Sequence, residues 1–234
     1  MEIDYKNIKV IGFDADDTLW VNETYFRDAE VEFGKLLSEY ETLNKIDQEL
    51  FKKEIDNLNL YGYGIKAFTL SMVESALELS NYNISAKKIE SILNIGKNML
   101  NKPVELLDGV EEVLKKLSKK YKLILATKGD LLDQERKLEK SGLTKYFHHI
   151  EVLSDKKEAN YSKLLKHLDI KPSEFLMVGN SLKSDVLPLV NIHAHAIHVP
   201  FHTTWAHEQV TEKDTNGKAY ATINSLIEIL KKLN

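Results

Sequence analysis

The chain has 234 residues, of which 43% are hydrophobic and 29% charged, with a net charge of −4 and no cysteine. This composition is ordinary for a globular protein, the negative charge argues against a general nucleic-acid binder, and the lack of cysteine excludes disulfides and thiolate zinc sites. The acidic start Met1–Asp4 has no secretion-signal pattern, and no apolar run approaches the ~18 residues of a membrane helix. We expect a cytoplasmic monomer or homodimer that binds neither nucleic acid nor membranes.

The first predicted element is a short apolar strand, residues 9–13, that ends in two carboxylates. Asp14 and Asp16 follow it, with Thr18 close behind. Such a run is typical of a buried parallel strand whose C-terminal end opens into a site. Two carboxylates this close repel each other, and a hard divalent cation such as Mg²⁺ is the usual compensation. One carboxylate can then act as a nucleophile and the other as a general acid and base.

On Asp14, Asp16 and Thr18, an Asp-x-Asp-x-Thr motif, the chain resembles the haloacid dehalogenase-like (HAD) hydrolases. The resemblance implies that Asp14 is the nucleophile, that Asp16 is the acid and base, and that Asp14 and the backbone carbonyl of Asp16 bind Mg²⁺. Dehalogenating members lack the second aspartate. Asp16 therefore favours a small phosphorylated metabolite as the substrate.

Residues 22–101 show no strand-like alternation and carry amphipathic segments that predict helices over residues 22–41, 45–57, 65–80 and 85–100. The resemblance implies that this stretch is a helical cap, inserted into a core domain of residues 1–21 and 102–234, that closes over the site. Between the second and third helices, Tyr63 is a candidate substrate contact, although a tyrosine there can equally be a core residue of the turn.

The second and third predicted strands, residues 122–127 and 150–153, also end in polar residues. The resemblance implies that the Thr127 hydroxyl binds the transferring phosphoryl group. Lys128 stands where many members have Asn, as a second phosphate contact or a surface charge. A lysine after the third strand would neutralise the aspartate and the phosphoryl oxygens. We prefer Lys156, which is nearer the strand end, and Lys157 is the alternative.

The fourth predicted strand, residues 175–179, precedes a segment that is similar to the family's Gly-Asp-x-x-x-x-Asp metal motif. Asp185 matches the second acid of that motif. Asn180 stands where an Asp is usual, and its amide oxygen can still bind Mg²⁺ directly or through water. Because the site carries one negative charge fewer, we expect weaker Mg²⁺ binding.

Strand and helix alternate along the rest of the chain, which predicts an α/β fold with a Rossmann-like parallel sheet. The ligand of such a sheet lies beyond the C-terminal ends of its strands, where Asp14, Thr127, Lys156 and Asn180 all fall. Further helices are predicted at residues 109–121, 131–141, 160–168, 184–191 and 223–233, and a fifth strand at residues 194–199.

Other activities fit parts of the same pattern. A sugar-phosphate mutase uses the same four motifs, and a binding protein could retain the fold without the chemistry. Phosphonate-cleaving members use a cap lysine, for which Lys35, Lys45, Lys52, Lys53 and Lys66 are available. The C-terminal part also invites a zinc site, although its spacing matches no standard zinc motif. The residues concerned are His193, His195, His198, His202, His207 and Glu208.

Overall fold

The computed structural model describes residues 5–233, so the acidic start Met1–Asp4 lies outside the described residues. The chain divides into two compact units. One comprises the chain up to Glu23, residues Val104–Lys128 and the chain from Gln134 onwards; the other comprises Thr24–Pro103 and Gly129–Asp133. No helix of the described part has the length and apolar character needed to cross a membrane.

The first unit is built on a six-stranded sheet in which every pair of neighbouring strands is parallel. The strand order is β3-β2-β1-β4-β5-β6, which confirms the predicted α/β fold with a Rossmann-like sheet. The sixth strand is only two residues long and was not predicted. The strands are β1 (Val10–Phe13), β2 (Lys122–Lys128), β3 (His149–Leu153), β4 (Phe175–Gly179), β5 (His195–His198) and β6 (Ala221–Thr222).

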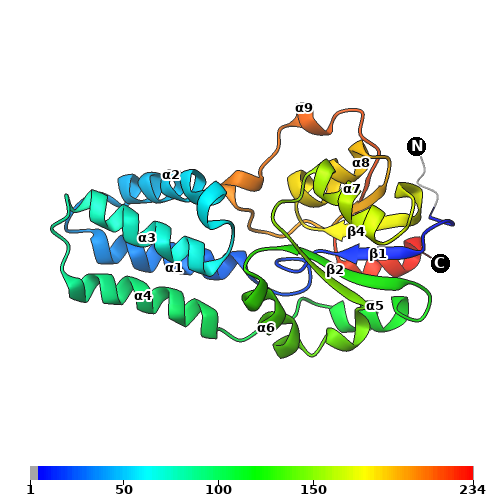
Figure 1. Cartoon of the computed structure of the whole chain (residues 1–234), viewed down its shortest axis with the longest axis horizontal. Coiled ribbons are helices and arrows are strands. Elements are labelled where there is room, and N and C mark those ends of the chain that lie inside the picture. Colours follow the sequence, from blue (N-terminus) through cyan, green and yellow to red (C-terminus); the bar gives the residue numbers. More distant parts are fainter. Residues whose placement is uncertain (1–4, 234) are drawn as a thin grey trace. The chain divides into compact units, whose positions relative to one another are not determined.

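Helices cover both faces of this sheet (Figure 1). Alternate strand residues point to opposite faces, so Ile11 and Phe13 enter one core and Val10 enters the other. The first core also contains residues of α5 (Val110–Leu117), α6 (Leu131–Ser141) and α10 (Ile229–Lys232). The second contains residues of α7 (Glu158–His167) and α8 (Leu187–Asn191). Both faces of the sheet are therefore buried. Only the ends of its strands can carry the side chains of a functional site.

The prediction of one helix over residues 184–191 is wrong in its start and its form. A π-helical turn, Leu182–Val186, comes first and α8 follows it. Pro188 lies in the first turn of α8, where the missing N–H costs no helical hydrogen bond. Shorter elements complete the unit: α9 (Glu212–Thr215) and 3₁₀ turns at Thr144–Tyr146, Pro172–Glu174, Ala206–Glu208 and Leu226–Glu228.

The second unit is helical, with α1 (Glu23–Leu37), α2 (Leu43–Tyr61), α3 (Ile65–Leu79) and α4 (Ala86–Asn101). Helix α3 packs against both α2 and α4. A Cβ on Gly96 would lie 2.1 Å from Thr69 Oγ1, so a glycine lets α4 approach α3 closely. Segment Gly129–Asp133 groups with this unit, where Lys66 Nζ lies 2.8 Å from Asp130 Oδ1. A cap function for these helices stays a prediction.

Candidate functional site

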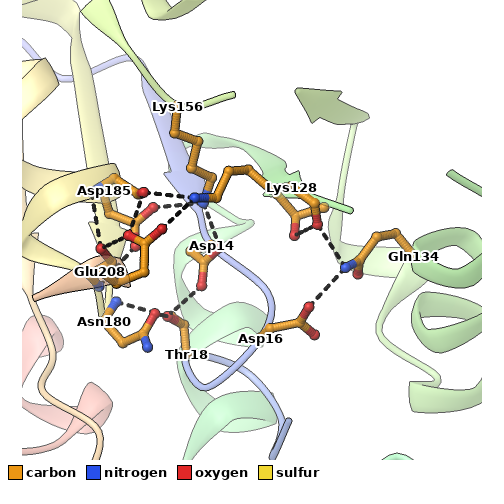
Figure 2. A network of polar contacts seen from close by, with 12 residues as sticks. Asp14, Asp16, Thr18, Lys128, Gln134, Lys156, Asn180, Asp185 and Glu208 are labelled. Atoms are coloured by element: carbon orange, nitrogen blue, oxygen red, sulfur yellow. Dashed lines mark hydrogen bonds and ion pairs between the residues drawn. The ribbon is translucent and has the colours of Figure 1, made fainter. Parts of the chain in front are cut away.

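Polar side chains from four strands of the first unit meet at one edge of the sheet. Phe13, the last residue of β1, is in register with Leu125 of β2 and Val178 of β4. The residues that follow these positions therefore lie at the same C-terminal edge. Figure 2 shows side chains from all these strand ends in one network of polar contacts.

Lys156 is at the centre of this network. Its Nζ lies 2.5 Å from Asp14 Oδ1 and 2.6 Å from Asp185 Oδ1, and the three side chains are 2%, 9% and 1% exposed, respectively. Lys157, by contrast, is exposed and pairs with Asp155. Of the two lysines that the sequence left open, Lys156 is the one that contacts the aspartate.

Burial and charge set the protonation of this cluster. Burial raises the pKa of Asp14 to about 7; Lys156 opposes that rise and Asp185 adds to it. Burial by itself would lower the pKa of Lys156, but the two neighbouring carboxylates outweigh it and raise that pKa well above its usual value. Lys156 is therefore a cation. With both acids ionised, one ammonium balances two carboxylates, and the cluster keeps a charge of −1 for a cation to compensate.

Thr18 holds the other oxygen of Asp14. Its Oγ1 donates to Asp14 Oδ2 at 2.9 Å and accepts the Asn180 N–H at 3.0 Å. The amide oxygen of Asn180 lies 3.3 Å from the same hydroxyl. The Asp14 N–H donates to Val178 O at 2.9 Å, so the strand ladder continues one residue past β1. Asp14 is thus fixed from its backbone and from both carboxylate oxygens.

Asp185 lies directly against the end of β4. A Cβ on Gly179 would lie only 2.3 Å from the Asp185 carboxyl group, so this contact requires a glycine. The Ser181 N–H donates to Asp185 Oδ2 at 3.0 Å. The π-helical turn therefore brings Asp185 back to the strand end from which the segment starts.

Asp16 points to a different set of partners, and its side chain is 23% exposed. Trp20 Nε1 donates to its Oδ1 at 2.7 Å, Lys137 Nζ to the same oxygen at 2.6 Å, and Gln134 Nε2 to its Oδ2 at 2.8 Å. Sequence reasoning missed Gln134 and Lys137, both on α6. A sequence signal for Gln134 existed: it is a polar residue four positions before Leu138, on the same side of the helix as that apolar residue.

Asp17 shapes the turn that follows the two site aspartates. Its φ of 61° is in the left-handed region, and its carboxylate accepts the N–H groups of Asn22 at 2.8 Å and Glu23 at 2.9 Å. Burial raises the pKa of Asp17 to about 8, against these two donors, which lower it. Asp17 therefore has two structural roles. Its backbone forms the turn, and its carboxylate accepts the N–H groups at the start of α1.

The three remaining candidates have different surroundings. Thr127 is buried at the end of β2, and its hydroxyl donates to Lys128 O at 3.2 Å. Lys128 Nζ lies 2.6 Å from Glu208 Oε1 and donates to Ser184 Oγ at 2.9 Å. Tyr63 lies between α2 and α3, in the helical unit. Glu208, which sequence reasoning considered only as a zinc ligand, has no local pattern that would reveal its place in this network.

The donor set at the strand ends suits a hard cation. Within residues 5–233, no group of three or more His, Cys, Asp or Glu side chains is arranged to hold a metal ion. The Mg²⁺ ligands that the sequence predicted include only two carboxylates from the cluster, Asp14 and Asp185, together with the Asn180 amide oxygen and the backbone carbonyl of Asp16. All are oxygens, the ligands that Mg²⁺ prefers, so these residues fit Mg²⁺.

Two of the C-terminal histidines, His198 and His207, have other partners. His198 Nε2 lies 3.0 Å from Asn180 O, so this nitrogen carries the proton. His207 lies beside Lys183, whose Nζ donates to the His207 carbonyl oxygen. Together with the absence of a three-ligand group in the described part of the chain, these contacts leave the zinc alternative without support.

Comparison with known proteins finds both phosphatases and dehalogenases. N-acylneuraminate-9-phosphatase from Mus musculus is 25% identical over 190 residues, which cover 76% of this chain and 77% of the mouse protein. A haloacid dehalogenase-like family hydrolase from Xanthomonas campestris is 37% identical, with a TM-score of 0.86 over 97% of this chain and 92% of that one. A 2-haloacid dehalogenase from Pseudomonas syringae pv. tomato shares the fold at 19% identity, with a TM-score of 0.62 over 97% and 98% of the two chains.

The family model described as haloacid dehalogenase-like hydrolase matches residues 8–193, which run from the start of β1 past the π-helical turn. The match therefore includes all four strand ends of the site. This match, together with the 37% identity to the Xanthomonas campestris hydrolase, establishes the family. This chain belongs to the haloacid dehalogenase-like hydrolases.

Proposed function

We propose that this hydrolase is a Mg²⁺-dependent phosphatase that cleaves a small phosphate monoester through an aspartyl-phosphate on Asp14. The observation that carries the proposal is the contrast between two aspartates two residues apart. Asp14 is buried against Lys156, and Asp16 is partly exposed among neutral and cationic donors. A halide leaves without a proton, whereas the oxygen of an ester needs one, so a second carboxylate that reaches solvent favours phosphate esters.

In the first step, an oxygen of Asp14 attacks the phosphorus atom and the bond to the ester oxygen breaks. Asp16 gives its proton to the leaving oxygen. Thr127 and Lys156 stabilise the phosphoryl oxygens, on which negative charge lies in the transition state. Lys128 is a second candidate for contact with these oxygens. The contact between Lys156 and Asp14 supports this role, because the ammonium lies beside the carboxylate that the phosphoryl group would join.

In the second step, Asp16 takes a proton from water, and the water oxygen attacks the phosphorus atom of the aspartyl-phosphate. The bond to Asp14 breaks, which releases phosphate and restores the carboxylate. A carboxylate has about four acceptor sites. The three donors from Trp20, Gln134 and Lys137 orient Asp16 and still leave capacity to accept from water.

Asp14, Asp185, the Asn180 amide oxygen and the backbone carbonyl of Asp16 would hold Mg²⁺. When bound, Mg²⁺ compensates the negative charge that Asp14 and the phosphoryl group bring together. Lys156 and Thr18 keep the two carboxylates and Asn180 in position for this binding. Because Asn180 is neutral, we expect a higher Mg²⁺ requirement than a carboxylate at this position would give.

We further propose that the helical unit is a cap over the site, and that Tyr63 in its loop contacts the substrate. Closure of such a unit would exclude water during phosphoryl transfer. The mouse relative is named for its action on N-acylneuraminate 9-phosphate, so that sugar phosphate comes first among the natural esters to be tried here.

Release of p-nitrophenol from p-nitrophenyl phosphate tests the proposal, measured with Mg²⁺ and with EDTA. Asp14→Asn removes the nucleophile with little change in volume, and we expect turnover to fall by about 10⁴-fold or more. Asp169→Asn is the matched control, because Asp169 is exposed and its left-handed φ of 53° also suits Asn. This control should keep the wild-type rate.

Two results would contradict the proposal. One is an Asp14→Asn protein that retains the wild-type rate. The other is a folded wild-type protein that releases no phosphate in Mg²⁺ from p-nitrophenyl phosphate or from a panel of sugar phosphates, phosphoglycolate and nucleotide monophosphates.

A further inference from the structure

Glu208, in the 3₁₀ turn after β5, is a carboxylate with three strong donors and a side chain that is only 12% exposed. Lys128 Nζ lies 2.6 Å from its Oε1. Ser181 Oγ and Ser184 Oγ donate to its Oε2 at 2.5 Å and 2.6 Å. Figure 2 shows Glu208 beside Asp185 and Asn180, on the side of the site away from Asp16.

Glu208 is ionised at neutral pH. Burial by itself would raise its pKa, but Lys128 and the two serine hydroxyls outweigh it and lower the pKa to about 2. A buried carboxylate that keeps its charge can only accept hydrogen bonds. Glu208 therefore determines where the hydroxyl protons of its neighbours point.

These protons fix the start of the π-helical turn. Because the Ser181 hydroxyl gives its proton to Glu208, its lone pairs are available to the Ser184 N–H, which donates to it at 3.0 Å. The Ser184 hydroxyl likewise donates to Glu208 and accepts from Lys128 at 2.9 Å. The O–H bond of each serine thus points in one direction, towards the Glu208 carboxylate.

The same turn carries two of the proposed Mg²⁺ ligands. Asn180 precedes Ser181 in the chain, and the Ser181 N–H donates to Asp185 Oδ2 at 3.0 Å. One hydrogen bond therefore links Glu208 to the residue that lies between these two ligands. Groups that orient metal ligands in this way change metal affinity by about 10- to 100-fold when they are removed.

We propose that Glu208 is a positioning residue for the proposed Mg²⁺ site: through Ser181, Ser184 and Lys128 it holds the turn that carries Asn180 and Asp185. This inference rests on the proposed function. It assigns a role to the segment after β5, whose sequence shows no motif for this chemistry. In this role Glu208 acts through Lys128, Ser181 and Ser184 and not by contact with substrate or metal.

The test is direct binding of Mn²⁺, a spectroscopic substitute for Mg²⁺, followed by electron paramagnetic resonance of the free ion and by competition with Mg²⁺. Glu208→Gln retains the shape of the side chain but adds a donor where the hydroxyls need an acceptor. We expect its Mn²⁺ dissociation constant to rise about 10-fold or more. Glu212→Gln is the matched control, since Glu212 is exposed four residues further on, and it should bind as the wild type does.

A second readout separates positioning from a general loss of structure. At saturating Mg²⁺, the kcat of Glu208→Gln should return close to the wild-type value, while the Mg²⁺ concentration for half-maximal rate stays raised. Ser184→Ala removes a hydroxyl from the same network at little cost in volume and should weaken Mn²⁺ binding in the same direction, by less. If circular dichroism shows that Glu208→Gln does not fold, the Mn²⁺ dissociation constant of Ser184→Ala tests the inference instead.

Equal Mn²⁺ dissociation constants for the wild type, Glu208→Gln and Glu212→Gln would overturn the inference and leave the proposed function intact. Equal constants for the wild type and Ser184→Ala, in a case where Glu208→Gln does not fold, would overturn it as well. Failure of the wild type to bind Mn²⁺ or Mg²⁺ at all is a different result, because it overturns the metal dependence in the proposed function itself.

Discussion

Asp14 and Asp16 are separated by one alanine, yet their surroundings differ in every respect that controls the chemistry of a carboxylate. Asp14 lies in the interior against Lys156 and Thr18. Asp16 reaches solvent and is held by Trp20 and by two residues of α6. Burial raises the pKa of Asp14, which Lys156 opposes.

In the proposed function, this contrast allows one short turn to supply both a nucleophile and an acid and base. A nucleophile gains from a fixed position and from a neighbouring cation that matches its charge. An acid and base must exchange protons with water, and partial exposure allows this exchange. In a regular strand, side chains two residues apart share a face. Asp14 and Asp16 have different surroundings because β1 ends at Phe13 and the chain then enters the turn in which Asp17 has a left-handed φ of 61°.

Removal of Lys156 should have the largest effect and would break the buried half of this comparison. Lys156→Met leaves Asp14 and Asp185 as buried acids without their cation. We expect the free energy of unfolding to fall by about 3–5 kcal/mol, and activity to be lost. Urea unfolding in EDTA measures the first effect. Lys157→Met is the control: that lysine is 74% exposed, and its loss should change stability by less than about 1 kcal/mol. Equal effects of the two substitutions would contradict the assignment.

Replacement of Asp16 tests the exposed half. Asp16→Asn cannot exchange a proton, so we expect turnover to fall by about 10²- to 10⁴-fold. Mn²⁺ binding should change little, because the backbone carbonyl of this residue is the proposed ligand. Single-turnover kinetics with a sugar phosphate, whose alkoxide leaving group needs a proton, resolve formation and hydrolysis of the aspartyl-phosphate, and both should be slower. Unchanged turnover would exclude the acid–base role.

A smaller effect is the loss of stability at low pH, which tests whether Glu208, another buried carboxylate of the site, is ionised. The folded protein lowers the pKa of Glu208 from 4.5 to about 2, which corresponds to about 3 kcal/mol of stability. Because the folded pKa is the lower one, this contribution is complete above about pH 5 and is lost as the pH falls towards 2. Urea unfolding of the wild type and Glu208→Gln in EDTA should show a gap at pH 6 that narrows by pH 3. A gap independent of pH would contradict an ionised Glu208.

The positions of the site residues along the chain were predictable. Short apolar runs that end in Asp14, Thr127 and Asn180 carry a local signal, since a buried parallel strand needs a continuous run of apolar residues. Parallel pairing then places these residues at one edge without knowledge of any contact. Helix ends were less predictable. One helix was expected over residues 184–191, but Pro188, which has no N–H to donate to the preceding turn, lies in the first turn of α8, and a π-helical turn comes before it.

The partners of each site residue were decided only by the tertiary structure. Lys156 and Lys157 are adjacent in sequence, and only the path of the chain from β3 to α7 directs one to Asp14 and the other to solvent. Glu208 comes from a turn 80 residues beyond Lys128. The spacing of apolar residues in the sequence indicates which residues are buried, because the buried face of a single strand or helix recurs with the period of that element. The choice of a polar partner depends on where separate elements bring their side chains, and no local pattern of residues encodes that.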